Sequence, residues 1–213
     1  ALQCFKVVAK ANPSSAEGRQ ALVSIRNIYL SMNQIDKYFS YVSTLPDVKL
    51  EQAEQDSLVY LTAENAMVEN RYAEALTGFK HYLDTYPQGL FMVDAWKHAA
   101  FCADKIGDKA NLKSAYARLS QLNIAESEAA TGKLASLYYA DKEYKPALGY
   151  YRQLEKMAST PENIMAARLG QMRCYRALGQ SKDLVESALM LLRTDGVPAQ
   201  EVDEARYFIA HAA

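Results

Sequence analysis

The histidines and cysteines are the residues of this chain that could bind a metal or act as nucleophiles, and their spacing favours neither. The histidines are His81, His98 and His211, and the cysteines are Cys4, Cys102 and Cys174. They do not form a set with the spacing of a zinc site or a disulfide framework. No metalloprotease helix, nucleophile elbow, P-loop or dinucleotide-binding glycine motif occurs either. We therefore expect three buried cysteines, no catalytic residue, no metal and no cofactor, and a protein that is not an enzyme.

Charged side chains offer two further candidate groups. Glu126 with Glu128, and Asp203 with Glu204, come near expected helix starts, where a negative charge interacts favourably with the helix dipole. Three arginines of one expected helix could together receive an acidic or terminal-carboxylate group. They are Arg168, Arg173 and Arg176. Pairing of these arginines with Glu and Asp of neighbouring helices is the interpretation we favour.

The composition narrows the class of partner. The chain has 213 residues, of which 50% are hydrophobic and 23% are charged, as is typical of a globular protein. The 24 Lys and Arg nearly balance the 25 Asp and Glu, without a basic stripe, so we do not expect nucleic acid as a partner. No apolar run is long enough to span a membrane. With only 9 Gly and 6 Pro, the chain favours helix almost throughout.

Turn signals divide the chain into alternating helices. One set of breaks recurs about every 34 to 38 residues, at 32–34, 69–71, 106–108, 140–142 and 178–180. A second set alternates with it, at 12–14, 45–47, 86–89, 121–123, 159–161 and 196–198. Gly and Asn tolerate the left-handed backbone that ends a helix, and Pro suits the first turn of the next one. The two sets predict helices of roughly 13 to 18 residues.

Within these helices the apolar residues recur at intervals of three and four, and no segment alternates as a strand does. We expect one buried face to carry Leu22, Ile25, Tyr29 and Met32. We expect similar faces to carry Leu58, Leu61, Asn65 and Val68, and Leu134, Leu137 and Tyr138. Ala75 and Ala147 are small where paired helices cross, and Trp96 is expected in the core.

The spacing resembles the tetratricopeptide repeat (TPR) family, in which antiparallel helix pairs stack. The clearest unit reads Tyr72-x-x-Ala75-x-x-x-Phe79-x-x-Tyr82-Leu83-x-x-Tyr86-Pro87-x-Gly89. This unit is similar to repeats of bacterial cell-envelope proteins, namely the Tol-Pal-associated periplasmic protein and the outer-membrane assembly lipoprotein, and the chain also resembles long Bacteroidetes-type repeat proteins. The resemblance implies a periplasmic or outer-membrane-associated location, with a cytoplasmic one as the alternative.

This register predicts an all-α, right-handed α-solenoid of about twelve antiparallel helices, with a period of about 35–37 residues. It makes residues 1–213 one TPR-like segment, truncated at both ends and part of a longer protein. Residues 1–12 form a lone second helix, residues 13–198 form five helix pairs, and residues 199–213 form a lone first helix.

In the TPR family the first helices line a concave groove that holds a partner segment. Carried over by register, the groove residues are Gln20, Val23, Asn27, Tyr60, Glu64, Asp94, Lys97, Phe101, Tyr139, Arg173 and Arg176. Exposed aromatic residues among them would anchor a ligand, and the alternative is that all are solvated or packed between repeats. The carboxylate clamp of some relatives is disfavoured, because Val23, Leu61, Asp94 and His98 occupy four of its five places.

We therefore predict a non-enzymatic scaffold that binds a protein or peptide in the groove. The first alternative is a structural spacer or self-association module of a long repeat protein. The second is a segment of a glycan-binding envelope lipoprotein, which would cluster aromatic faces and amides at one open site. The identity of the partner and the oligomeric state are left open.

Overall fold

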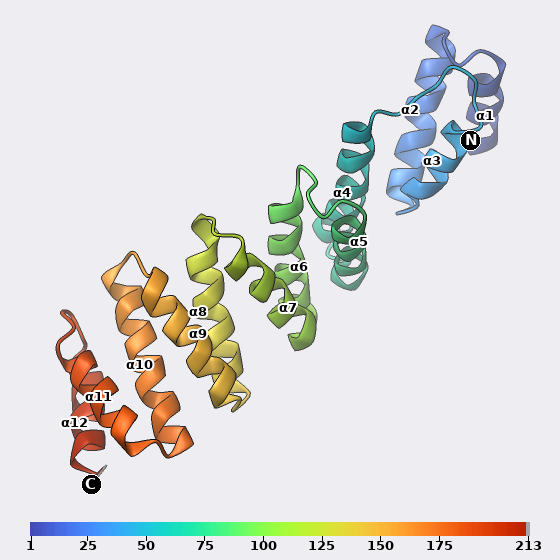
Figure 1. Ribbon diagram of the computed structural model, residues 1–213. Coiled ribbons are helices and arrows are strands. Elements are labelled where there is room, and N and C mark those ends of the chain that lie inside the picture. The colour runs from blue at the N-terminus through green and yellow to red at the C-terminus, as the bar shows by residue number, and fades with distance from the viewer. Residues whose placement is uncertain (212–213) are drawn as a thin grey trace. The chain divides into compact units, whose positions relative to one another are not determined.

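A computed structural model describes residues 1–211 of the chain. Within that range the chain forms twelve α-helices and no strand (Figure 1). They are α1 (Leu2–Ala11), α2 (Ala16–Ser31), α3 (Ile35–Val42), α4 (Gln52–Val68), α5 (Tyr72–Thr85), α6 (Met92–Ile106), α7 (Lys109–Gln121), α8 (Ala125–Ala140), α9 (Tyr144–Met157), α10 (Pro161–Leu178), α11 (Ser181–Leu192) and α12 (Ala199–Ala210). The predicted fold class, all-α with about twelve antiparallel helices, is confirmed. The last two residues of the predicted helix 199–213 lie outside the described residues.

Left-handed backbone turns mark the repeat. Asn33, Asn70, Gly107, Lys142 and Gly179 all have positive φ, and successive ones are 37, 37, 35 and 37 residues apart. Each follows the end of a helix that begins a pair, at a break predicted from the sequence. Asn and Gly enter the left-handed region at low cost, and this lets the chain reverse directly into the next helix. Lys142 is the exception, because its side chain gives no such advantage.

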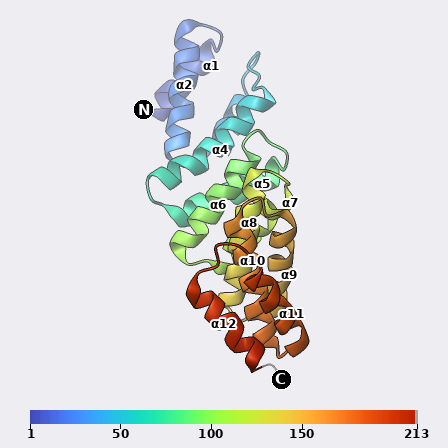
Figure 2. The same cartoon turned by 90° about the vertical axis from the view of Figure 1, so that its left-hand side faces the viewer.

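The chain divides into two compact units, Ala1–Leu112 and Lys113–Ala213, and the boundary falls within α7. In the first unit α1 packs along α2, and α5 packs between α4 and α6. In the second unit α9 packs between α8 and α10, α11 packs on α10, and α12 packs on α11 and touches α10 (Figure 2). The single uninterrupted array over residues 1–213 stays a prediction.

One helix of the first unit is shorter than predicted. α3 has only 8 residues, compared with an expectation of 13 to 18. Pro46 lacks the N–H that a continuing helix needs, and Asp47 adopts positive φ, so the chain leaves the helix at this point. The segment 48–51 then runs without regular structure to the start of α4.

Small residues allow the helices of both units to cross closely. In the first unit a Cβ atom added to Gly78 would lie 2.8 Å from the Cβ of Ala63 on α4. In the second, a Cβ added to Gly170 of α10 would overlap the ring of Tyr151 on α9. Ala75 and Ala147 are completely buried, as the sequence predicted. Because the helices are closely packed at these small residues, a larger side chain at any of them would have little room.

A buried carboxylate fixes the turn between α5 and α6. Asp56 of α4 is only 6% exposed. Its Oδ1 accepts a hydrogen bond from the Tyr82 hydroxyl (2.6 Å), and its Oδ2 accepts one from the Leu90 N–H (2.9 Å). The Phe91 N–H donates to the Tyr82 oxygen at 2.9 Å. A Cβ on Gly89 would lie 2.9 Å from Asp56 Oδ2, so glycine leaves the space that the carboxylate occupies. This network accounts for Tyr82 and Gly89 of the sequence motif.

The predicted apolar faces are partly wrong. Leu61 and Val68 of α4 are 38% and 72% exposed, and Met32 at the end of α2 is exposed as well. α4 instead buries Leu58 and the residues that follow it at intervals of four. Those residues are Thr62 and Ala66. Small and hydroxyl-bearing side chains belong to this buried face, and a pattern based on large apolar residues misses them. Trp96 is half-buried rather than fully enclosed in the core.

None of the helices over residues 1–211 combines the length and the hydropathy that a membrane span requires.

Replacing Tyr82 by Phe should destabilise the first unit. The substitution leaves a buried carboxylate oxygen and the Phe91 N–H without their partner, which costs about 1–3 kcal/mol of unfolding free energy. Urea unfolding followed by the fluorescence of Trp96, the only tryptophan, measures this change. Tyr72→Phe is the matched control, because its hydroxyl bonds Asn70 on the surface. Equal stability losses in the two variants would contradict the role assigned to Asp56.

Lys142→Gly should stabilise the second unit by about 0.5–1 kcal/mol, because glycine adopts the left-handed region without the strain that a lysine Cβ causes. Lys145→Gly, in the exposed first turn of α9, should destabilise the same unit, since glycine costs about 1 kcal/mol in a helix. Hydrogen exchange of the α8 and α9 amides would show slower opening in the first variant and faster opening in the second. If Lys142→Gly did not slow the opening of these helices, the backbone at this turn would not be strained.

Candidate partner-binding surfaces

The predicted groove residues of the first unit lie on α2, α4 and α6. We call this side of the three helices the first-helix face, and it carries Gln20, Val23, Asn27, Tyr60, Glu64, Asp94, Lys97 and Phe101. Most of these residues are exposed, and Glu64 is half-buried. Arg26 of α2 lies 3.8 Å from Glu54 of α4, so neighbouring helices of the face are in contact through side chains.

Tyr60 differs from this prediction, because it is only 5% exposed and cannot serve as an exposed anchor. Its ring stacks on Phe91 with centroids 4.5 Å apart and meets the edge of Tyr82 at 5.6 Å. Its hydroxyl lies 3.0 Å from Nδ1 of His98 on α6 and 3.4 Å from Glu64. Burying the ring between α4 and α6 gains more apolar contact than exposing it to solvent. Tyr60 therefore holds the two helices together beneath the first-helix face.

Burial and nearby carboxylates shift the pKa values of both Tyr60 and His98. Burial raises the pKa of Tyr60, and the negative charges of Glu64 and Asp94 raise it further. Burial also lowers the pKa of His98, although the same two carboxylates act in the opposite direction. A neutral imidazole can accept the hydroxyl proton of Tyr60 at Nδ1, whereas an imidazolium cannot. The contact is thus strongest when His98 is uncharged.

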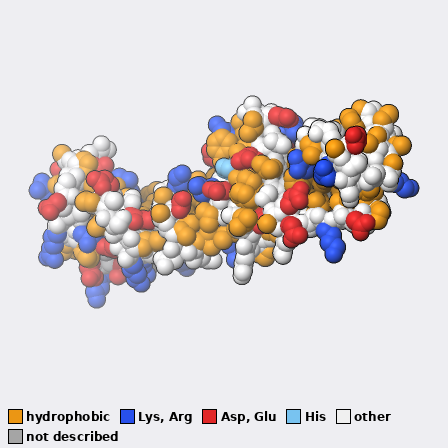
Figure 3. Space-filling view, turned by 90° about the horizontal axis from the view of Figure 1, so that it is seen from above, with side chains coloured by type: hydrophobic (Ala, Val, Ile, Leu, Met, Phe, Trp, Pro, Cys, Tyr) orange, Lys and Arg blue, Asp and Glu red, His pale blue; other side chains and the backbone are white. Residues whose placement is uncertain are grey.

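Exposed apolar side chains also occur on the first-helix face. Val23, Leu61 and Phe101 come from α2, α4 and α6, and Phe101 is 45% exposed. The ring of Phe101 contacts the edge of Tyr72 at 5.8 Å, and Nζ of Lys105 lies 5.3 Å from its centroid. Asp94 and Lys97 pair at 3.3 Å on the same helix. Acidic, basic and hydrophobic side chains are interspersed on the surface that Figure 3 shows.

The predicted groove residues of the second unit are tied to their neighbours. Arg173 of α10 binds Glu204 of α12 through two hydrogen bonds, of 2.9 and 2.6 Å. The guanidinium of Arg176 lies 5.4 Å from the ring centroid of Phe208. Tyr139 is half-buried, and its ring meets the edge of Tyr144 at 5.4 Å. Arg173 and Tyr139 are half-buried and link their helices to adjacent elements, whereas Arg176 is exposed.

The three arginines of α10 do not form one cluster. Arg168 faces α9, where it binds Glu155 at 2.8 Å, while Arg173 and Arg176 face α12. The predicted pairing with Glu or Asp of adjacent repeats is confirmed for Arg168 and Arg173. Arg173 and Arg176 lie five and eight residues after Arg168, so they point in other directions around the helix axis. Helices pack on both sides of α10, and the arginines therefore contact different neighbours.

The carboxylate pairs behave differently from each other. Glu126 and Glu128 lie in the first turn of α8, as predicted. Glu128 also accepts hydrogen bonds from Ser159 and from the Asn163 side chain, which lowers its pKa. The prediction for Asp203 and Glu204 is wrong, because α12 begins at Ala199 and both residues lie beyond its first turn. Glu204 is the partner of Arg173 instead.

The cysteines are not activated. Cys102 and Cys174 are buried, and burial raises the pKa of each thiol to about 11, so neither is a thiolate near neutral pH. Cys4 is exposed on α1, contrary to the prediction, because α1 buries only Ala9 completely. Over residues 1–211 no group of three His, Cys, Asp or Glu side chains could hold a metal ion.

Two contributors to the first-helix face were not recognised in the sequence. His98 was named only as a misfit to a carboxylate clamp, and Leu61 was also assigned to a buried apolar face, although it is 38% exposed. The spacing along the helix could have identified His98 and Leu61, because both lie on the same side of their helices as the predicted groove residues. Phe91, which stacks on Tyr60, precedes α6 and gave no periodic signal.

Comparisons with known proteins gave structural likenesses only. No protein-family model and no curated protein matches the chain. Among solved structures, YrrB, a TPR protein with an unusual peptide-binding site, is 13% identical with a TM-score of 0.49, covering 97% of this chain and all of that one. A putative kinesin light chain from Podosopora anserina with nearly identical TPR-like repeats is 12% identical (TM-score 0.47, covering 90% and 94%). BtubC (BKLC) from P. vanneervenii is 10% identical (TM-score 0.46, covering 98% and 87%).

Acidification should destabilise the first unit through His98. Its pKa in the folded protein lies below the ordinary 6.5, so its contribution is complete above 6.5 and is lost as the pH falls through the folded value. Between about pH 7.5 and about pH 5, the urea midpoint reported by Trp96 should fall more in the unaltered protein than in His98→Gln. An NMR titration of the His98 ring should give a pKa below 6.5. Equal falls in midpoint would exclude His98 as a contributor.

Proposed function

We propose that this protein is a non-enzymatic scaffold that binds an extended segment of a protein or peptide along the first-helix face. The observation that carries the proposal is the contact of Tyr60 with Phe91 and His98, which locks α4 to α6. Because the side chains beneath the surface are held in place, the residues above them keep fixed positions before a partner arrives. A surface organised in advance loses less conformational entropy on binding.

The chemistry of the face suits a segment with mixed character. Phe101 and Leu61 offer apolar contact, while Asn27, Glu64 and Asp94 offer hydrogen-bond acceptors to polar groups. Tight interfaces typically centre on an aromatic residue surrounded by polar ones, and Phe101 has that position on α6.

We also propose that the protein acts in the bacterial cell envelope and is not an enzyme. The location is supported by the Tyr72–Gly89 sequence unit alone. The lack of catalysis is supported by the state of the reactive groups, since two thiols are buried and protonated and His98 is bound to Tyr60. A self-association module and a glycan-binding segment are the competing outcomes of the test below.

Photo-crosslinking in the cell that makes the protein tests the first-helix face. A photoreactive amino acid at Asn27 or Phe101 should capture a partner protein several-fold more efficiently than one at Thr77 or Lys80. The latter two are exposed residues of α5 and serve as matched controls. Phe101→Ala should weaken binding of the captured partner by about tenfold, which corresponds to about 1.4 kcal/mol.

The outcomes of this experiment separate the candidate functions. Crosslinks at Thr77 and Lys80 with none at Asn27 or Phe101 would reject the first-helix face. Capture of a second copy of the chain alone would indicate self-association, and capture of glycan without protein would indicate the glycan-binding alternative.

A further inference from the structure

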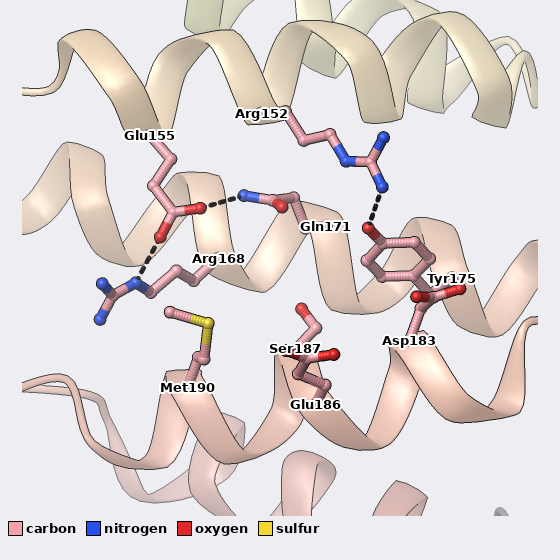
Figure 4. Close-up of a pocket in the computed structure, with 9 residues that line it drawn as sticks. All are labelled: Arg152, Glu155, Arg168, Gln171, Tyr175, Asp183, Glu186, Ser187 and Met190. Carbon is pink, nitrogen blue, oxygen red and sulfur yellow. Dashed lines mark hydrogen bonds and ion pairs between the residues drawn. The ribbon is translucent and has the colours of Figure 1, made fainter.

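A polar pocket lies among α9, α10 and α11 in the second unit. Its volume is about 250 Å³, below the range of about 300–1,000 Å³ typical of drug-sized ligands. Figure 4 shows α9 and α11 on either side of α10, with side chains from all three helices directed into the space between them. Arg152 and Glu155 come from α9, and the remaining residues come from α10 and α11. They are Arg168, Gln171, Tyr175, Asp183, Glu186, Ser187 and Met190.

The cations of the pocket already have partners. Arg168 donates to Glu155 at 2.8 Å, and Gln171 donates to the second oxygen of the same carboxylate at 2.7 Å (Figure 4). Burial alone would raise the pKa of Glu155, but these two hydrogen bonds bring it below its ordinary value. Arg152 donates to the Tyr175 hydroxyl at 2.5 Å, and its guanidinium lies 5.5 Å from that ring's centroid. The donors on the α9 and α10 sides are therefore engaged.

The α11 wall, in contrast, presents acceptors without donors. Among the residues described, Asp183 and Glu186 have neither an ion pair nor a hydrogen bond, and the Ser187 hydroxyl has no hydrogen-bond partner. Ser187 is only 9% exposed, and its hydroxyl points into the pocket (Figure 4). The hydroxyl is not among the fully enclosed polar atoms that lack a partner, so it is open to the pocket and available to a hydrogen-bond donor that enters it. Ser187 therefore adds a neutral hydrogen-bonding group beside the two carboxylates of α11.

We propose that this pocket binds a cationic side chain, lysine or arginine, of a partner segment. Three side chains of α11 that can accept hydrogen bonds line the pocket, where a group with several N–H donors could bond them, and the five charged residues sum to −1. The exposed methylene groups of Met190 and the ring of Tyr175 provide a lining for the aliphatic part of such a side chain. An acidic ligand would be repelled by the carboxylates of Asp183 and Glu186.

The pocket differs from the first-helix face in its helices and in its chemistry. α9 and α11 are the second helices of their pairs, and α10 contributes the side that faces them. The inference does not depend on the proposed function, because the pocket could hold a cation even if the first-helix face bound nothing.

NMR on the full chain tests the inference with simple probes. Blocked tripeptides Gly-Lys-Gly and Gly-Arg-Gly should shift the amide signals of Gln171, Glu186 and Ser187, with millimolar affinity. Blocked Gly-norleucine-Gly, which has an uncharged chain of similar length, and Gly-Glu-Gly should not. Cadaverine carries the same ammonium group without a peptide, so binding to it alone would assign the pocket to free amines rather than to a partner segment and would overturn the proposal.

Two variants and a matched control locate the binding. Asp183→Asn combined with Glu186→Gln should weaken binding of Gly-Lys-Gly by at least about tenfold. Asp195→Asn alters an exposed acid outside the pocket and should leave binding unchanged. Ser187→Ala should weaken binding several-fold without loss of thermal stability, because it removes a hydroxyl that bonds nothing in the free protein. Undiminished binding in the double variant, or no shift with either basic tripeptide, would overturn the proposal.

Discussion

The left-handed turn after each first helix is the constraint on which the rest of the structure depends. It reverses the chain at nearly constant intervals, so residues at the same distance before a turn occupy the same place on successive helices. Asn27, Glu64 and Phe101 each lie six residues before such a turn and fall on one face of the first unit. A turn displaced by one residue would rotate that position by about 100° around its helix and remove it from the face.

Burial then decides which members of a face remain available. Tyr60 occupies a groove position by register, yet its ring is enclosed by Phe91 and His98. The enclosed ring joins α4 to α6, and the surrounding side chains remain at the surface. Asp56 is a buried charge of the same kind. Hydrogen bonds from the Tyr82 hydroxyl and the Leu90 N–H to its carboxylate compensate its loss of water, and the Phe91 N–H in turn donates to the Tyr82 oxygen. The Tyr60 ring and the Asp56 carboxylate are both buried, and each holds neighbouring segments in place from beneath the surface.

α10 shows how one helix serves two different environments. Its Arg173 and Arg176 contact α12, whereas its Arg168, Gln171 and Tyr175 contact α9 or line the pocket beside α11. On one side the charges are paired and close the packing between helices. On the side that faces α9 and α11, Arg168 and Gln171 bind Glu155 of α9, and the carboxylates and Ser187 of α11 have no partner within residues 1–211. The difference arises from the side chains that lie opposite, because Arg173 meets Glu204 of α12, whereas Arg168 and Gln171 share Glu155 of α9.

The sequence by itself determined the helices and their turns. Gly, Asn and Pro act through their own backbone preferences, which hold in any surroundings, and ten of the eleven predicted breaks contain at least one of them. The break at 140–142 contains none. Ala75 and Ala147 could likewise be assigned to helix crossings, since only small residues fit there. Only the tertiary structure decided which groove residues are exposed, how the α10 arginines divide, and that Ser187 lines a pocket. Those properties depend on which side chain of another helix lies opposite, and the spacing within one helix carries no information about that neighbour.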